Sequence, residues 1–438
     1  MKKIDRIMVD MSATLIHHGH TRLIKKASEL GLVIVGLTTD KEILIHKGYS
    51  PEISYENRKE ILEAISNVSE VVPVPWLIDD KTLDKYKIDF LVHGDDNSNL
   101  VSDKKLKSFK RTDNISSSNI RSNAMRSIAQ KKNNKLMLTP GPAAVLYENL
   151  SSLQPLFGRG DEKYTNIYNE VSTWLKKISG QDEIITAQGS STFAIELAAH
   201  SFIRGRVLLI STGYYSDRME VLLSKECEII KCNYEDLSII SGDFDWVLCA
   251  YTETSCAFKA EIEFIRDETD RLGAKLFLDA TGSIGLESKH ELADAMAFSS
   301  CKGLFGLVGA CFIAHKNGLT EYETDNFYFN LETHRKKLVT GPYHAIASLY
   351  GVMSLHDELR DRVKKSKDFV LNKWQSLVKS KKNQPLLCTH LNGIIFPKDD
   401  SVVLYSPRSN LQGSIICHFG EIHSDQINLE NRIDIEEI

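Results

Sequence analysis

The sequence predicts an α/β protein with two regions of parallel sheet followed by a smaller α+β region. Its 438 residues exceed the usual size of one domain, about 100 to 200 residues. Short apolar runs alternate with amphipathic stretches twice along the chain, and such alternation is typical of parallel sheets covered by helices on both faces. Residues 341–438 have shorter apolar runs and a long charged stretch. We therefore expect two large units and one small one.

The first expected unit spans residues 1–125. Its expected strands are Arg6–Met11, Leu32–Thr38, Glu70–Val74 and Asp89–His93, and its expected helices are Gly19–Leu30 and Tyr55–Val68. The stretch 126–135 includes Gln-Lys-Lys-Asn-Asn-Lys and has no apolar period, so it predicts a linker.

The large part of the second region is expected to span residues 136–340, and a shortened α+β domain residues 341–438. The large part has expected helices at Tyr164–Ile178, Thr192–Ile203 and Glu261–Leu272, and expected strands at Val207–Ser211, Trp246–Tyr251 and Lys275–Leu278. The small domain has a charged helix at Ile346–Val378 and strands at Gly393–Phe396, Val402–Tyr405 and Ser414–His418.

Composition excludes several classes of protein. The chain has 54 basic and 59 acidic residues and a net charge of −5, which does not favour nucleic-acid binding. Charged residues near the start interrupt any signal peptide, and the longest weakly polar run, Gly303–Ala314, is shorter than the roughly 20 residues of a membrane span. The eight cysteines form no CxxC pair, which argues against disulfides and zinc. We expect a cytoplasmic protein without a bound structural metal.

The first candidate site begins with His17-His18-Gly19-His20, where the first strand leads into the first helix. A helix amino terminus favours phosphate, and His17 and His20 have a spacing that places both on one ligand. The alternative is that these are surface histidines at a helix start. A second segment, Arg111-Thr112-Asp113-Asn114-Ile115-Ser116-Ser117, places a cation and hydroxyls at another expected helix start, where they also fit simple capping.

Together the two motifs are more specific. HxGH followed by R-T-x-x-I-S-S resembles the glycerol-3-phosphate and phosphoethanolamine cytidylyltransferase family over residues 5–122. The resemblance implies a Rossmann-like nucleotidyltransferase fold and CTP carrying Mg²⁺ as substrate. It implies that His17 and His20 bind the α-phosphate and that Arg111, Ser116 and Ser117 bind the β- and γ-phosphates. Lys47 is the candidate for bridging the acceptor and nucleotide phosphates, and Arg58 for binding the nucleotide. The family reads G-T-F-D where this chain has Met11-Ser12-Ala13-Thr14.

The second candidate site combines three elements. Gln188-Gly189-Ser190-Ser191-Thr192 precedes an expected helix, Asp279 ends a buried strand, and Lys302 lies in a nearly uncharged stretch. Each has a structural alternative, as a cap or as a lysine that reaches solvent. A helix start for phosphate, a carboxylate for a pyridinium and a lysine for an imine are also the parts of a pyridoxal phosphate site.

This arrangement resembles the class V aminotransferases of fold type I, and within them the 2-aminoethylphosphonate transaminases, from Leu138 to about Glu421. The resemblance implies that Lys302 forms the Schiff base with pyridoxal 5'-phosphate and that Asp279 pairs with its ring nitrogen. The other implied contacts are stacking by Tyr215, a bond to the 3-oxygen side by Thr254, and phosphate binding by Ser190, Ser191 and Thr192. Thr340 of a partner subunit completes the phosphate site, so a homodimer is implied.

One departure affects substrate binding. The family carries F-R-I-G-x-I-G-[DE] near its end, whereas this chain has Ile415 in the arginine position. Arg408, in Tyr405-Ser406-Pro407-Arg408, is the candidate substitute for that substrate-binding arginine.

The combined interpretation is a bifunctional enzyme of phosphonate metabolism that joins a cytidylyltransferase to an aminotransferase. It uses CTP, a small phosphonate or phosphate acceptor and an amino donor. One alternative is a phosphoethanolamine or related cytidylyltransferase with a differently specific second unit. Another treats the second unit as a pyridoxal-phosphate-binding dimerisation scaffold without turnover. A nicotinamide-binding function is disfavoured because neither unit has GxGxxG after its first strand.

Overall fold

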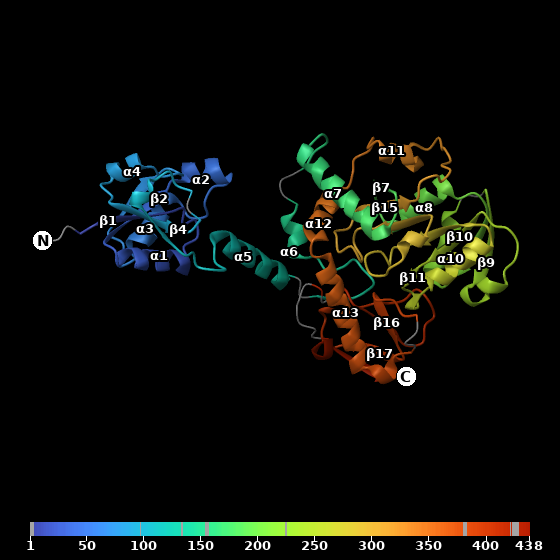
Figure 1. The fold of residues 1–438 in the computed structure, drawn as a ribbon. Helices are drawn as coiled ribbons and strands as arrows, with labels where there is room; N and C mark the ends of the chain where they lie inside the picture. The colour runs from blue at the N-terminus through green and yellow to red at the C-terminus, as the bar shows by residue number, and fades with distance from the viewer. Residues whose placement is uncertain are drawn as a thin grey trace. The chain divides into compact units, whose positions relative to one another are not determined.

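The computed structural model describes residues 4–96, 98–132, 135–153, 157–223, 226–379, 383–420, 422 and 429–438. The chain divides into two compact units, residues Met1–Ile128 and Ala129–Ile438 (Figure 1). Helix α5 (Ser117–Lys132) extends through most of the stretch expected as a linker, because its Ala, Arg, Gln and Lys residues favour helix even without an apolar period. Positions 133 and 134 of that stretch lie outside the described residues.

The first unit contains a five-stranded parallel sheet in the order β3-β2-β1-β4-β5. Its strands are β1 (Arg6–Met11), β2 (Leu32–Thr38), β3 (Glu70–Val74), β4 (Phe90–Gly94) and β5 (Leu106–Phe109). The strand order reverses between β1 and β4. Ligands bind at such a switch point, beyond the carboxyl ends of the strands. The Rossmann-like prediction is confirmed.

Helices cover both faces of this sheet. Alternate residues of β1 point to opposite faces, and each face packs against helices in its own hydrophobic core. Ile7 and Val9 pack with helices α1 (His18–Ser28) and α3 (Tyr55–Glu63), whereas Met8 packs with α4 (Asp80–Lys85). Helix α3 ends five residues before the predicted limit at Val68. A further helix, α2 (Asp40–Lys47), ends at Gly48, whose φ of 71° suits glycine.

The second unit contains a seven-stranded sheet in the order β7-β15-β14-β13-β10-β8-β9. Among the described strands, β15 is antiparallel to both β7 and β14, and the other neighbouring pairs are parallel. The strands are β7 (Glu183–Gln188), β8 (Gly205–Ser211), β9 (Cys227–Asn233), β10 (Trp246–Ala250), β13 (Lys275–Asp279), β14 (Ala295–Ser299) and β15 (Ala310–His315). A short hairpin, β11 (Thr252–Glu253) and β12 (Phe258–Lys259), follows β10.

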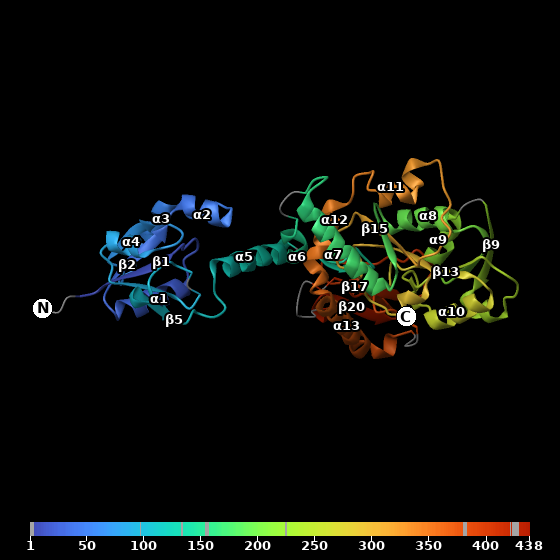
Figure 2. The ribbon, with the colours of Figure 1, turned by 45° about the horizontal axis from the view of Figure 1, so that its top comes forward.

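Helices again cover both faces. One face packs against α7 (Glu162–Ser179), α10 (Ile262–Arg271) and α12 (Tyr343–Met353), and the other against α8 (Ser191–Phe202), α9 (Tyr214–Leu222) and α11 (Leu331–Arg335). Figures 1 and 2 both show α7 and α12 side by side, and α12 also contacts α6 (Tyr147–Ser151). Within the described ranges, no helix is both long enough and apolar enough to cross a bilayer.

The carboxy-terminal part differs from the prediction in two ways. The single helix expected at Ile346–Val378 is two helices, α12 and the charged α13 (His356–Lys373), because α12 is buried against the large sheet whereas α13 packs on the small strands. Strand β6 (Leu136–Leu138), expected in the large part, pairs with β18 (Val402–Leu404). The other strand pairs are β16 (Cys388–Leu391) with β19 (Ser414–Cys417), and β17 (Gly393–Pro397) with β20 (Ile433–Glu437).

Candidate active sites

The two motif histidines lie at the amino terminus of α1. His17 is the N-cap residue, and its Nδ1 accepts a hydrogen bond from the Gly19 backbone N–H at 3.1 Å. The Nδ1 of His20 accepts from the His17 N–H at 3.2 Å. Because both Nδ1 atoms act as acceptors, each neutral ring carries its proton on Nε2. Both imidazoles are therefore fixed as Nε2–H donors.

Both histidines are held in the neutral form. Burial, with the nearby His17 and Arg111, lowers the pKa of His20 to about 4. Burial also lowers the pKa of His17, helped by His18 and Arg111. Gly19 allows the two rings to approach within 3.9 Å between centroids, since a Cβ at this position would lie 2.9 Å from the His17 ring.

A cavity of about 280 Å³ lies against these histidines. It brings together most of the residues that the cytidylyltransferase motifs predicted, which come from α1, α2, the segment after β5 and the start of α5: His17, His20, Lys47, Arg111, Ser116 and Ser117. Asp10, His93 and Asp96 also line it, and the sequence alone assigned them no role in a site.

The two serines connect α5 to the cavity. Ser116 accepts a hydrogen bond from the Asn119 N–H at 3.0 Å and so caps α5. The Ser117 hydroxyl donates to the Leu15 carbonyl at 3.1 Å and accepts from the Leu15 N–H at 3.4 Å. Arg111 is more exposed, and its Nη1 lies 2.5 Å from an Asp96 oxygen. Ser117 thus also fastens the loop that precedes the histidines.

Arg58, which the motifs predicted to bind the nucleotide, does not line the first cavity. It is fully buried. Its guanidinium donates to the Ser12 carbonyl, to the Thr38 carbonyl at 3.0 Å and to Asp40 at 2.6 Å. These bonds join the carboxyl ends of β1 and β2 to the start of α2. The sequence motif gave no sign of this bracing geometry.

Asp10 adds a carboxylate to the lining of the first cavity. Its Oδ2 accepts from Asn99 Nδ2 at 2.9 Å, and its Oδ1 lies 3.7 Å from His93 Nε2. Among the described residues, Asp10 Oδ1 has no hydrogen-bond partner, although it is buried. Burial raises the pKa of Asp10, and the nearby His93 opposes that shift. Lys47 and Arg111 add two cations to the lining of the same cavity.

The second unit has a smaller cavity of about 80 Å³ next to Lys302. It brings together six residues that the aminotransferase motifs predicted: Ser191, Thr192, Tyr215, Thr254, Asp279 and Lys302. Burial lowers the pKa of Lys302, and the nearby Asp279 opposes that shift. Asp279 is itself buried, and it accepts a hydrogen bond from the Thr281 N–H at 2.9 Å.

The side chains of this cavity fit pyridoxal 5'-phosphate. Ser190 is the N-cap residue of α8 but, within the described chain, makes no side-chain capping bond, which leaves the helix start open to a phosphate. The buried hydroxyls of Thr252 and Thr281 likewise lack hydrogen-bond partners among the described residues. Asp279 supplies a carboxylate for the ring nitrogen, and the Lys302 Nζ lies 6.0 Å from the centre of the Tyr215 ring.

Three predicted residues are not among those that line this cavity: Ser190, which directly precedes two that do, and the more distant Thr340 and Arg408. Thr340 lines a separate cavity of about 100 Å³ with Tyr168, Thr186 and Lys337. Arg408 is exposed, and its Nη1 lies 3.2 Å from the Tyr214 hydroxyl. Ile415, which occupies the family's arginine position, is buried in an apolar cluster.

A buried carboxylate that the sequence did not assign holds the stacking residue. Glu253 Oε2 accepts from the backbone N–H groups of Tyr215 and Ser216, both at 3.0 Å, at the start of α9. Its Oε1 accepts from the Ser255 N–H at 3.1 Å and from the Ser255 hydroxyl at 2.5 Å. The signal was present in the motif Glu253-Thr254-Ser255, but only the structure shows its partner helix.

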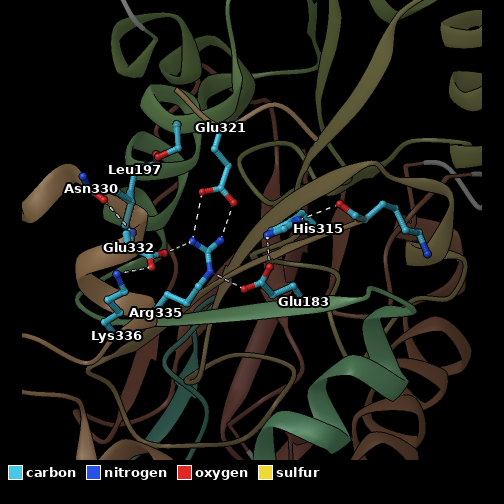
Figure 3. Close-up of polar contacts among 10 residues, drawn as sticks. Glu183, Leu197, His315, Glu321, Asn330, Glu332, Arg335 and Lys336 are labelled. Atoms are coloured by element: carbon cyan, nitrogen blue, oxygen red, sulfur yellow. Dashed lines mark hydrogen bonds and ion pairs between the residues drawn. The ribbon is translucent and has the colours of Figure 1, made fainter. Parts of the chain in front are cut away.

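A third group of charged residues lies at the edge of the large sheet. Glu183, His315 and Glu321 are close enough to share an ion. Figure 3 shows the Arg335 guanidinium among the carboxylates, 2.7 Å from Glu183, 2.6 Å from Glu321 and 2.7 Å from Glu332. The Arg335 guanidinium already pairs with all three carboxylates, so the group is an ion-pair network that fastens α11 to β7.

Comparisons with known proteins agree with this division into two units. Residues 14–123 match the cytidylyltransferase-like family model. The chain is 40% identical over 97 residues to ethanolamine-phosphate cytidylyltransferase of Mus musculus, a match that covers 22% of this chain and 24% of that protein. It is 26% identical over 257 residues to 2-aminoethylphosphonate–pyruvate transaminase of Pseudomonas aeruginosa, covering 51% of this chain and 68% of that protein.

A solved structure of alanine–glyoxylate aminotransferase from Nostoc sp. has a TM-score of 0.57 and 15% identity, and the match covers 66% of this chain and 91% of that one. This similarity supports the predicted fold of the second unit. The chain therefore joins a cytidylyltransferase-like domain to a domain with the fold of pyridoxal-phosphate-dependent aminotransferases.

Proposed function

We propose that the chain is a bifunctional enzyme of phosphonate metabolism. In the first unit, CTP-dependent cytidylyl transfer to 2-aminoethylphosphonate gives CMP-2-aminoethylphosphonate and pyrophosphate. In the second unit, transamination interconverts phosphonoacetaldehyde and 2-aminoethylphosphonate with an amino and keto acid pair. The product of one reaction is then the acceptor of the other. The eight cysteines are free thiols, which fits a reducing compartment such as the cytoplasm.

The charge distribution in the first cavity carries this proposal. Lys47, Arg111 and two Nε2–H donors suit phosphate and phosphonate oxygens, whereas the unpaired Asp10 oxygen suits an ammonium group. An acceptor with an ammonium at one end and an anionic phosphorus group at the other matches both. Glycerol 3-phosphate has no cation for Asp10.

The transfer needs positioning and charge stabilisation more than a protein nucleophile. The anionic oxygen of the acceptor attacks the α-phosphorus of CTP, and the bond to the β-phosphate oxygen breaks. His17 and His20 donate to the α-phosphate oxygens, while Arg111, Ser116 and Lys47 bind the departing pyrophosphate and the acceptor. Mg²⁺ accompanies the triphosphate. Arg58 does not contact the nucleotide in this scheme. It holds the carboxyl ends of β1 and β2 next to the start of α2.

Pyridoxal 5'-phosphate supplies an electron sink for amino-group transfer when it is bound in the second unit. Lys302 moves the proton, Asp279 holds the ring nitrogen, and Tyr215 stacks on the ring. Thr254 bonds the 3-oxygen side, and Ser190, Ser191 and Thr192 bind the phosphate. Thr340 lines a different cavity, which fits a contribution from a second copy of the chain, so we propose a homodimer. Arg408 is the candidate for the substrate's acid group.

In a second candidate function, the second unit binds the cofactor but does not catalyse transamination. It is favoured by the buried Ile415, which places an apolar cluster where the related enzymes carry an arginine for the substrate. Adding an amino donor to the protein with cofactor separates the two. Catalysis predicts a change in the visible absorbance of the cofactor, whereas an unchanged spectrum with alanine, glutamate and 2-aminoethylphosphonate indicates a scaffold.

The cytidylyl reaction is tested by pyrophosphate release with CTP, Mg²⁺ and a panel of acceptors. We expect 2-aminoethylphosphonate to have the highest kcat/KM. A preference for phosphoethanolamine would assign the alternative acceptor with the same charges. A preference for glycerol 3-phosphate would contradict the role given to Asp10.

A further inference from the structure

Arg121 links three parts of the first cavity's frame. It lies on α5, one turn beyond Ser117. Its Nε and Nη2 both bind the Glu52 carboxylate, the latter at 2.6 Å, and Nη2 also donates to the Thr14 hydroxyl at 2.8 Å. Glu52 belongs to the loop between α2 and α3, and Thr14 to the loop before the motif histidines. One guanidinium therefore joins two loops to the helix that carries the serines.

The geometry of this link is well defined. The pair is bidentate, and the Arg121 guanidinium lies 4.8 Å from the centre of the Tyr49 ring. The hydrogen bonds from Arg121 lower the pKa of Glu52, so the carboxylate is ionised. Burial and the nearby Arg121 lower the pKa of Lys47, and the charge of Glu52 opposes that shift. Glu52 thus acts both on the histidine loop, through Arg121, and on Lys47.

Thr14 occupies the position where cytidylyltransferases with HxGH carry an aspartate, as the last residue of G-T-F-D. Thr14 is buried, with 1% of its surface exposed, and its hydroxyl is neutral, so it gives Arg121 a hydrogen-bond acceptor but no negative charge. We propose that Glu52 supplies, from a different loop, the carboxylate that this position lacks, and that Arg121 is the residue that receives it. Glu52 and Arg121 are positioning residues, which hold the His17 loop and Ser117 at a fixed spacing. The inference rests on the proposed cytidylyl transfer.

This exchange predicts a specific pattern of rescue. Glu52→Gln removes the charge that fixes Arg121, and Thr14→Asp adds a second carboxylate beside the first. Each change alone lowers kcat/KM for CTP, by about tenfold, since small displacements of catalytic groups are costly. The double variant again has one carboxylate for one guanidinium. We expect it to recover to within about threefold of the wild type.

The experiment compares the wild type, Thr14→Asp, Glu52→Gln and the double variant as full chains. Pyrophosphate release with CTP, Mg²⁺ and 2-aminoethylphosphonate is measured, with kcat and KM determined separately. Thermal unfolding shows whether each variant folds. Recovery in the double variant supports the exchange, and activity equal to or below the product of the two single effects overturns it. Glu63→Gln removes an exposed partner of Lys59 in the same unit and serves as the control that leaves activity unchanged.

Binding of CTP, followed by calorimetry without acceptor, separates this inference from the proposed function. If the wild type releases no pyrophosphate with any acceptor, the proposed reaction fails. The same four proteins then still decide the inference, because single losses of CTP affinity that are restored in the double variant support it. Equal affinity in all four proteins overturns it.

Discussion

The orientation of His17 and His20 is determined by backbone N–H groups, which fix the donor atom of each ring. We predict that His17→Ala and His20→Ala each lower CTP-dependent pyrophosphate release by about 100-fold or more, as expected when a transition-state donor is lost. The initial rate at saturating CTP and acceptor is the measurement. His18→Ala is the matched control, because His18 is exposed and not among the residues that line the cavity. Normal rates in both motif variants would remove the site.

Asp10 is the residue that we expect to select the acceptor. Asp10→Asn keeps the shape but removes the charge that pairs with an ammonium. We predict that the KM for 2-aminoethylphosphonate rises about tenfold or more, while the KM for CTP stays within about twofold. Steady-state kinetics with each substrate varied in turn test this. An equal effect on both KM values would indicate a general disturbance of the cavity.

At this scale, motif spacing predicted the residues whose roles depend on sequence neighbours. His17 with His20, and Ser116 with Ser117, lie where their motifs place them on helix starts. Asp10 and Arg58 were not predictable in this way, because their environments depend on contacts with Asn99 and Asp40 from other parts of the chain. Tertiary pairing of this kind leaves no local pattern in one sequence.

The amino terminus of helix α9 is held in place by the carboxylate of Glu253. Glu253→Gln keeps one acceptor oxygen, but it leaves part of the Tyr215 and Ser216 N–H pair without its charged partner. We predict that affinity for pyridoxal 5'-phosphate falls about tenfold, because Tyr215 loses its fixed position. Fluorescence titration of the cofactor measures this. Glu263→Gln, in an exposed pair with Lys289, is the control, and unchanged affinity in Glu253→Gln would contradict the role.

Elements with a clear apolar period were the most predictable from the sequence. The limits of β1, β2 and β3 agree with the prediction residue by residue. The break between α12 and α13 was not apparent, because both halves favour helix locally. It is fixed by packing, including the contact between the His356 ring and the Gly303 carbonyl at 2.9 Å. The pairing of β6 with β18 also spans a sequence distance that local patterns do not report.

The whole molecule contains buried histidines that make its stability depend on pH. Burial lowers the pKa of His20 and His290 to about 4 and that of His418 to about 3, below the ordinary 6.5. The unfolded chain therefore takes up protons below pH 6.5 that the folded chain does not, and the free energy of unfolding falls as the pH decreases from 6.5 towards 4.

We predict that His418→Gln loses less thermal stability than the wild type between pH 7.5 and pH 5.5. His418 is buried against Thr389 and Ser366, and glutamine keeps a polar partner without a group that titrates in this window. Calorimetric melting at the two pH values is the measurement. The ordinary carboxylates titrate below this range, so an equal loss in both proteins would contradict the assignment.

In the proposed function, the same chain makes an amine and then activates it. The most direct test incubates the full chain with pyridoxal 5'-phosphate, alanine, phosphonoacetaldehyde, CTP and Mg²⁺, and follows products by phosphorus NMR. We expect CMP-2-aminoethylphosphonate from the wild type. Lys302→Ala should lose its formation from phosphonoacetaldehyde but keep its formation from 2-aminoethylphosphonate, whereas His17→Ala should lose both. Absence of this product from the wild type with either starting compound would contradict the proposed function.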